Sequence, residues 1–360
     1  MCCRGSMQRV ADIGQDKGDG SAEKAAQNLS HFLGKVLDQL SITSWLPAAM
    51  LVGASAVLLQ LRSQGDYNVA AAVRALSDKP LGVLVVLLFA LVLAATVTQA
   101  FSFEAIRLLE GYWGAGLVTG RLLGWRVGRQ RQRLLRVRKA VEAWREAAFA
   151  SALDNMRRNG FSVNQVRVTE DEFRGVPQDL RPVYPAADVS AGLAVPWTTH
   201  CSPGKLAAYD RWLAQEEDFP DEHRLLPTRL GNVLRAREDG LRRDGKSLEG
   251  LVMRSYDRLP ARLLTQHDQF RDRLEMYCTL VPVLIVLAVA GAAALARSTD
   301  RYAGGAVAFI LFGALAVVAY RAAIASARGY GVVLAEVADR LHEPPPTAQA
   351  PTMLRRLLRR

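Results

Sequence analysis

LGVLVVLLFALVLAATVTQAFSF, residues 81–103, is the stretch that decides the fold. It contains no Asp, Glu, Lys, Arg or His, and it is longer than the ~20 helical residues that cross the hydrocarbon core of a bilayer. A buried helix of a large soluble core is the alternative, but such helices run shorter and usually carry a polar stripe. We therefore interpret this segment as a transmembrane helix.

Three more segments share this apolar character and also lack charged residues and histidine: 42–61, 277–296 and 302–320. The chain is therefore predicted to be mainly α: a polytopic α-helical membrane protein with four transmembrane helices. A mostly helical insert separates the second span from the third.

The distribution of basic residues predicts the side of the membrane on which this insert lies. The net charge is +11, and the short connections 62–80 and 297–301 hold only five basic residues. Eleven stand within twenty residues of the spans on the other side. The positive-inside rule places both termini and residues 104–276 in the cytoplasm. Because arginine far outnumbers lysine and alanine is abundant, we expect a bacterial inner-membrane protein from a high-GC genome.

The composition divides the chain into six predicted parts. The predicted parts are a disordered N-terminus (1–20), an N-terminal helix with spans one and two (21–103), the cytoplasmic insert (104–276), a hairpin of spans three and four (277–320), a C-terminal cytoplasmic helix (321–342) and a disordered basic tail (343–360).

Within the insert, the character of the sequence changes twice. Residues 104–160 are predicted to be helical throughout, 161–227 to be Pro-rich loops with a helix at 204–218, and 228–276 to be helices. FSVNQVRVTEDEF, which begins the Pro-rich region, suggests a short strand. In the first region, a seam for another helix follows spacings of three and four along Leu134, Val137, Val141, Trp144 and Ala148.

A basic cluster stands early in the insert. Its members are Arg126, Arg129, Arg131, Arg133, Arg136, Arg138 and Lys139. Such a cluster beside a membrane predicts binding to anionic lipid headgroups, although it is also compatible with a purely topological role. No aromatic and basic interleaving or DNA-binding motif accompanies it, so nucleic acid is not the expected partner.

Glycines recur at four-residue spacing in one place and at eight-residue spacing in another. Gly116, Gly120, Gly124 and Gly128 would form a bare ridge on one helix, either folded against the ends of the spans or used in oligomer formation. In the hairpin, Gly305 and Gly313 fall on a small-residue face. We expect the latter two to let the helices pack closely, so that replacing both with leucine lowers the stability of the protein in detergent.

A P-loop spelling, GLRRDGKS, occupies residues 240–247. The preceding stretch is charged and helical instead of an apolar strand, and no Walker B strand follows. We interpret the match as a false positive within a polar turn. His200, Cys201 and His223 match no metal pattern, and no catalytic set can be assembled, so no cofactor, no metal and no enzymatic activity are predicted.

LPTRLGNVLRAREDG (226–240), Leu259-Pro260 and YRAAIASARGYGVVLAEVADRL (320–341) together resemble an uncharacterised family of actinobacterial-type multi-pass membrane proteins with a TRLGN-containing cytosolic region. The resemblance implies the topology and no reaction. Its most distinctive residues include Thr228, Arg229, Asn232 and Glu238. They are candidates for a partner or ligand site, or for organising a helix start.

The favoured function is a membrane-anchored, non-enzymatic interaction or signalling component that forms a homo-oligomer or binds a protein partner. A pore-forming or membrane-disrupting effector of a bacterial conflict or antiphage system is the alternative. An enzyme with an unrecognised site in the insert is the third hypothesis.

Overall fold

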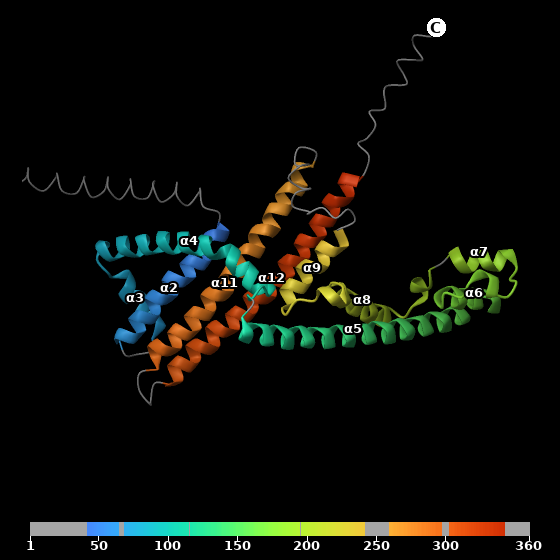
Figure 1. The fold of residues 1–360 in the computed structure, drawn as a ribbon, viewed down its shortest axis with the longest axis horizontal. Coiled ribbons are helices and arrows are strands. Elements are labelled where there is room, and N and C mark those ends of the chain that lie inside the picture. The colour runs from blue at the N-terminus through green and yellow to red at the C-terminus, as the bar shows by residue number, and fades with distance from the viewer. Residues whose placement is uncertain are drawn as a thin grey trace, which may run out of the picture. The chain divides into compact units, whose positions relative to one another are not determined.

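The computed structural model describes residues 42–64, 68–114, 116–194, 196–241, 259–296 and 302–342 (Figure 1). Among these residues helices dominate and no strand occurs, which confirms the mainly α class. The expected disordered N-terminus, N-terminal helix and basic tail lie outside the described residues. So do Gly245, Lys246 and Ser247 of the P-loop spelling, whereas Gly240 lies within helix α9 (Arg229–Leu241).

The chain divides into two compact units. The first comprises residues up to Ile106 and Asp272–Ala323, and the second comprises Arg107–Arg271 and Ile324–Arg360. The first contains α2 (Ile42–Gln64), α3 (Val69–Ser77) and most of α4 (Leu81–Glu110), with segments of α11 (Ala261–Leu295) and α12 (Tyr302–His342).

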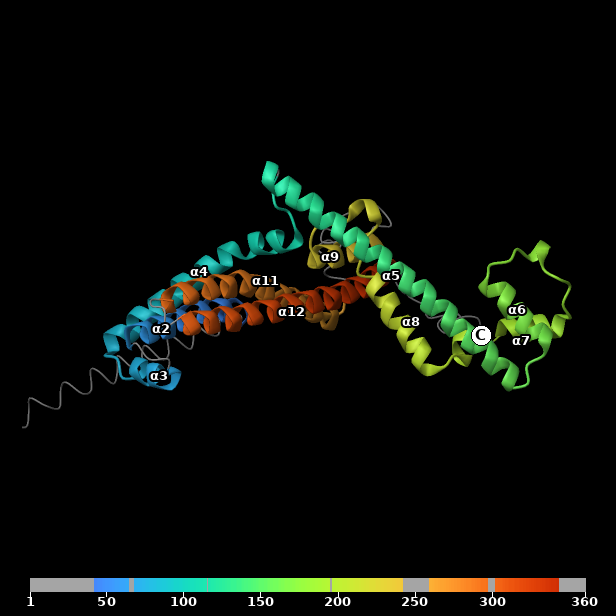
Figure 2. The same ribbon diagram turned by 90° about the horizontal axis from the view of Figure 1, so that it is seen from below.

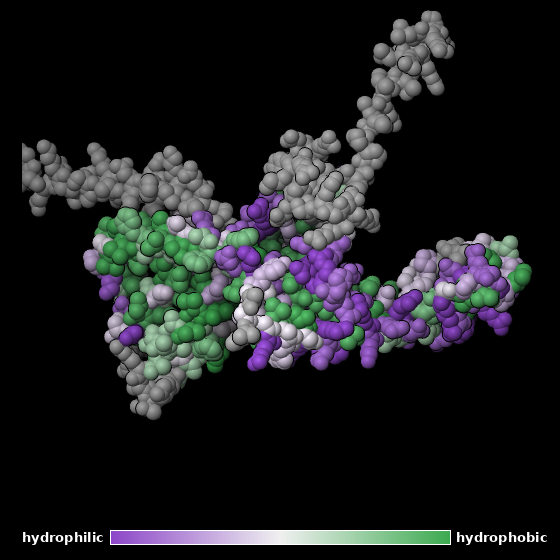
Figure 3. Space-filling model, in the orientation of Figure 1, coloured by the Kyte–Doolittle hydropathy of each residue, from purple (hydrophilic) through white to green (hydrophobic). Residues whose placement is uncertain are grey.

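Four helices are long and apolar enough to cross a membrane, namely α2, α4, α11 and α12. Each of them extends beyond its predicted span at one end, where polar helical residues continue the apolar segment, by three residues in α2 and by more in α4, α11 and α12. Apolar side chains cover the surface over α2 and α4 in Figure 3, as expected of helices that face lipid.

The first unit packs α2 and α12 against α11, and the three helices lie side by side in Figures 1 and 2. A Cβ atom on Gly291 would lie 3.2 Å from Ala308 Cβ and 3.3 Å from Leu58 Cδ1. A Cβ atom on Gly305 would lie only 2.9 Å from the carbonyl oxygen of Ala292. Close backbone approach therefore holds the α11–α12 hairpin together at Gly305.

The second unit is built on α5 (Leu117–Arg158), a helix of 42 residues. Beside it lie α6 (Val163–Phe173), η1 (Gln178–Leu180), α7 (Ala186–Ala194), η2 (Trp197–His200), α8 (Pro203–Glu216), η3 (Glu222–Arg224) and α9. The predicted seam on α5 is buried at Leu134, Val137, Val141 and Ala148. Trp144, also expected there, is exposed instead.

The far half of α5 carries a core of aromatic residues. Phe149 of α5 stacks on Phe173 at a centroid distance of 3.6 Å, and Trp197 meets both rings edge-on. Further along, Ala148 and Ala152 pack with Cys201 and with Leu206 and Tyr209 of α8. This burial fixes α6, η2 and α8 on α5.

The strand expected within 161–173 is wrong, because α6 occupies that stretch. Ser162 and Gln165 form a capping box, in which each side chain accepts a hydrogen bond from the other residue's backbone N–H. Val166, Val168 and Thr169 are buried. The cap and this burial outweigh the strand preference of the β-branched residues. The Pro-rich stretch that follows also contains an unexpected helix, α7, whereas α8 occupies the stretch 204–218 that was expected to be helical.

The helix expected to run unbroken through 104–160 is interrupted. Helix α4 ends at Glu110 and α5 begins at Leu117. Between them, Gly111 and Gly114 have φ angles of 105° and 59°, a region that favours glycine over residues with a Cβ atom. These two glycines end the helix.

The two hairpin glycines are predicted to differ when each is replaced with leucine. Gly305→Leu should lower the thermal midpoint of the detergent-purified protein, because overpacking a close contact costs about 1–3 kcal/mol. Gly313→Leu should not, because a Cβ atom at Gly313 meets nothing within 4 Å among the described residues. Equal loss of stability in the two variants would contradict the packing described above.

Candidate functional site

Helix α5 carries two opposite stripes at alternating spacings of three and four residues. On a helix with 3.6 residues per turn, such spacings keep side chains on one face. The inward stripe runs through Leu123, Val127, Gln130, Leu134, Val137 and Val141, all buried or half-buried. The outward stripe runs through Leu122, Trp125, Arg129, Gln132, Arg136 and Lys139, all exposed. The helix therefore has an outward face that is both apolar and basic.

Trp125 is the centre of the apolar part of the outward stripe. Its side chain is 57% exposed, and Leu122, one turn earlier, is 44% exposed. The guanidinium carbons of Arg126 and Arg129 lie 5.7 Å and 5.5 Å from the centroid of the Trp125 ring. A tryptophan flanked by arginines has the amphipathic character of residues found at membrane interfaces.

The predicted basic cluster is divided between two sides of α5. Arg131 pairs with Glu222, and Arg138 Nε lies 3.3 Å from Glu216 Oε1. Both of these arginines therefore face acidic residues of their own unit. Arg136 and Lys139 belong to the outward stripe, and Arg133 is half-buried. The positive charge that is turned outward is thus concentrated at Arg126, Arg129, Arg136 and Lys139.

The acidic partners come from one short segment, residues 216–222, with the sequence EEDFPDE. At its centre, Asp218 is 3% exposed. Its Oδ1 accepts a hydrogen bond of 2.8 Å from Arg328 Nε of α12, and its Oδ2 accepts bonds from Arg328 and Arg229. A buried carboxylate that accepts several charged hydrogen bonds holds its partners in a defined geometry. We name Asp218, Arg229 and Arg328 the acid knot.

The side chains of the distinctive residues Thr228 and Asn232 form hydrogen bonds with backbone groups. Thr228 Oγ1 donates to the carbonyl oxygen of Glu110 at 2.8 Å and accepts from Gly231 N at 3.1 Å. Asn232 is 1% exposed, and its amide bonds the N–H and the carbonyl of Leu226 at 2.7 Å and 3.1 Å. These bonds support the interpretation that the residues organise a helix start.

Two glycines allow α9 to approach the end of α4. A Cβ atom on Gly231 would lie 2.1 Å from the carbonyl oxygen of Glu110, which leaves no room for a side chain. A Cβ atom on Gly111 would lie 2.4 Å from Cγ of Pro227. The TRLGN sequence therefore encodes a tight contact between α9 and residues 110–111.

The four candidate residues of this region do not converge on one site. Arg229 pairs with Asp218 at 3.4 Å, a neighbouring segment, whereas Glu238 is exposed. Arg224 pairs with Asp239 nearby, and Arg235 donates to the carbonyl oxygen of Arg224 at 3.1 Å. The region is a network of ion pairs that fixes α9.

The predicted glycine ridge is open within its own unit. Among the described residues, a Cβ atom on Gly120, Gly124 or Gly128 would meet nothing within 4 Å. A Cβ atom on Gly116 would meet only Thr119 Oγ1 of its own helix, at 3.1 Å. The use of this ridge for close packing against another helix thus stays a prediction.

The cysteine and histidine candidates differ in their surroundings, and of the three Cys201 alone is buried. Cys201 Sγ lies 3.3 Å from the carbonyl oxygen of Ala148, and burial raises the pKa of its thiol. A buried thiol with a raised pKa is a poor nucleophile. The ring of His200 packs edge-on against Phe161, and His223 is exposed. Within the described ranges, no group of three or more His, Cys, Asp or Glu residues could hold a metal ion.

The sequence reasoning missed the acid knot. The run EEDFPDE was visible, because it places five acidic residues among seven, but such runs usually form solvated surface. Asp218 pairs with Arg229 and Arg328, whereas its neighbours Glu216 and Glu222 pair with Arg138 and Arg131 of α5. The division of the α5 arginines between two faces could also have been read from their spacing.

The chain was compared with protein-family models, with curated proteins and with solved structures, and none of the three comparisons gave a match. The function is therefore argued from the contacts, charges and burial of the described residues.

Replacing the buried carboxylate of the acid knot should destabilise the second unit. Asp218→Asn leaves Arg229 and Arg328 without their counter-charge, and we expect a loss of about 2–3 kcal/mol, because both arginines are partly solvated. Asp154→Asn is the matched control, since Asp154 forms an exposed pair with Arg157 and its loss should change stability by less than about 0.5 kcal/mol. Thermal unfolding of the purified protein measures both changes. Equal midpoints for the two variants would show that the knot contributes nothing.

Proposed function

We propose that this protein is a membrane-anchored, non-enzymatic interaction or signalling component of the bacterial inner membrane. Residues 104–276 lie in the cytoplasm, and the outward stripe of α5 binds anionic lipid headgroups. The observation that carries the proposal is the pair of opposite stripes on α5, one buried against its own unit and one exposed, apolar and basic. A helix with these two faces is suited to bridge a folded unit and a membrane surface.

The electrostatics of the stripe favour lipid. Each basic residue near an anionic membrane contributes about 1 kcal/mol to attraction, and this attraction falls off within a Debye length of about 8 Å at physiological salt. Arg126, Arg129, Arg136 and Lys139 are all exposed. Leu122 and Trp125 add an apolar contact at the depth of the headgroups. The acidic segment pairs with Arg131 and Arg138, which limits the basic character to one side of the helix.

Residues within the spans support an anchor over a pore. Thr96 and Thr98 of α4 donate their hydroxyls to the carbonyls of Val92 and Ala95, and Thr279 of α11 donates to that of Glu275. Each of these hydroxyls therefore has its hydrogen-bond acceptor within its own helix. Conducting pathways usually need polar or ionisable side chains that face a shared lumen.

The oligomeric part of the proposal rests on the open glycine ridge. Gly120, Gly124 and Gly128 leave a bare strip on α5, which lets another helix approach closely. A second copy of this chain or a cytosolic protein partner are both compatible with that strip.

The lipid contact of α5 can be tested with a spin label on the outward stripe of the full-length protein. Gln132→Cys, in a chain whose native cysteines are replaced with alanine, is labelled and reconstituted into nanodiscs of anionic or neutral lipid. We expect the label to be shielded from a water-soluble paramagnetic reagent in anionic discs, and to become accessible as salt rises. Arg129→Gln with Arg136→Gln should weaken the contact by about 2 kcal/mol, or roughly thirtyfold.

A label on the exposed Glu142, which is not part of the outward stripe, serves as the control and should stay accessible in both kinds of disc. Equal shielding of residue 132 in neutral discs at high salt would contradict the binding of anionic headgroups.

The anchor and the pore are separated by the membrane potential of cells that overproduce the protein. We expect the potential to be unchanged, because the described threonine hydroxyls of the spans are bonded within their own helices. A potential-sensitive dye reports the result. Depolarisation by the wild type, abolished by Gly305→Leu, would instead favour the pore.

A further inference from the structure

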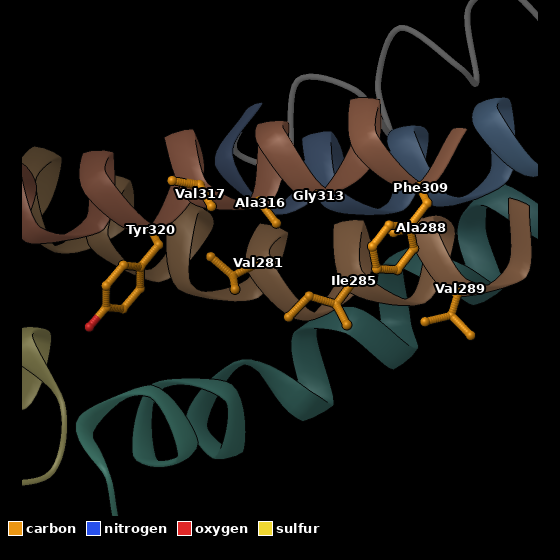
Figure 4. Close-up of a pocket in the computed structure, with 9 residues that line it drawn as sticks. All are labelled: Val281, Ile285, Ala288, Val289, Phe309, Gly313, Ala316, Val317 and Tyr320. Atoms are coloured by element: carbon orange, nitrogen blue, oxygen red, sulfur yellow. The ribbon is translucent and has the colours of Figure 1, made fainter. Parts of the chain in front are cut away.

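An apolar groove runs between α11 and α12 in the first unit (Figure 4). Its volume is about 300 Å³, and its lining comes from both helices. Ala288 and Ala316 are buried small residues that form its floor, and Gly313 adds no side chain. The hollow therefore exists because Ala288, Gly313 and Ala316 have small side chains or none, where larger side chains would fill the space between α11 and α12.

The walls of the groove are formed by exposed apolar side chains. Ile285 and Val289 rise from α11, and Phe309 and Val317 rise from α12. Each of the four is more than half exposed. Because both helices are long and apolar enough to cross a membrane, these walls lie within the hydrocarbon region.

One end of the groove changes from apolar to aromatic and basic on both helices. On α11, the four-residue stripe Val289, Ile285, Val281 continues through half-buried Tyr277 to exposed Arg273. On α12, the stripe Phe309, Gly313, Val317 continues to exposed Arg321, and Tyr320 closes the groove beside it. Each step of four residues turns a helix by only about 40° beyond a full turn, so Tyr277 lies close in direction to the lining residue Val281, and Arg321 close to Val317, whereas Arg273 is turned further away. This end of the groove is therefore marked by Tyr277, Tyr320 and Arg321.

This order of side chains matches the order of groups along a phospholipid. The apolar groove suits an acyl chain, tyrosines are favoured at the level of the ester and headgroup region, and arginines bind phosphate oxygens. Basic residues at the ends of paired transmembrane helices are a recurrent site for anionic headgroups. The charge at the end of the groove disfavours a neutral occupant.

We propose that the α11–α12 groove binds one anionic phospholipid, with an acyl chain in the groove and its headgroup phosphate at Arg321. The site differs from the outward stripe of α5 in position and in kind. It holds a single lipid by shape as well as by charge, so binding persists in detergent and at high salt. The proposal depends on α11 and α12 spanning the membrane, and it does not depend on the lipid contact of α5.

Native mass spectrometry of the full-length protein in detergent tests the site. The protein is mixed with phosphatidylglycerol and phosphatidylcholine that carry the same acyl chains, and bound lipids are counted by mass. We expect one lipid to be retained, with phosphatidylglycerol preferred. Arg321→Gln should reduce that preference by about fivefold, the loss expected for one basic residue at a membrane surface.

Gly313→Leu probes the groove itself. A Cβ atom at this position meets nothing within 4 Å among the described residues, so we expect a leucine side chain to occupy the hollow and retention of both lipids to fall by about tenfold. Gly53→Leu, at an equally open position on α2, and Arg74→Gln, an exposed residue of α3, are the matched controls and should bind lipid as the wild type does. Arg129→Gln with Arg136→Gln should also leave the count unchanged, which separates this site from α5.

Three results would overturn the proposal. The first is equal retention of the two lipids by the wild type. The second is normal retention by Gly313→Leu. The third is a dimer of the chain that Gly313→Leu dissociates while lipid binding is unaffected, since the groove would then be a contact between copies.

Discussion

The requirement that backbone polar groups be paired inside a bilayer is the constraint on which the rest of this structure depends. Water is absent from the hydrocarbon core, so a crossing segment must satisfy its own N–H and C=O groups, and a helix does so. The apolar segments therefore become α2, α4, α11 and α12. Because two spans precede the insert and two follow it, both of its ends emerge on one face of the membrane. The polar turns that extend α4, α11 and α12 carry the chain from the spans into the second unit.

Within the second unit, one acidic segment serves two purposes. Asp218 joins Arg229 of α9 to Arg328 of α12, and the flanking Glu216 and Glu222 pair with arginines on the inner side of α5. Burial of Leu134 and Val137 fixes the rotation of α5. Arg129, Arg136 and Lys139 then point outward together with Trp125. The exposed face of α5 is thus a consequence of how its other face is packed and neutralised.

Hydropathy and length were sufficient to predict the four spans, because lipid imposes a requirement that is local in sequence. Other features depend on tertiary contacts. Gly305 and Gly313 both lie on α12, yet only Gly305 lies against the backbone of α11. The register of the hairpin decides which of the two glycines faces α11. The helix at 163–173 was missed because its capping box and buried face outweigh its strand-like composition. Asp218 could not be singled out among its acidic neighbours, since its burial results from arginines distant in the sequence.

The sidedness of the insert is the central claim, and single-cysteine labelling in intact cells tests it most directly. In a chain without native cysteines, one cysteine replaces Val183, which is fully exposed in the insert, and another replaces Asp78, which is exposed between the first two spans. With a membrane-impermeant maleimide, the account predicts labelling of residue 78 in intact cells, and of residue 183 only after the cells are permeabilised. Labelling of residue 183 without permeabilisation, with residue 78 protected, would contradict it.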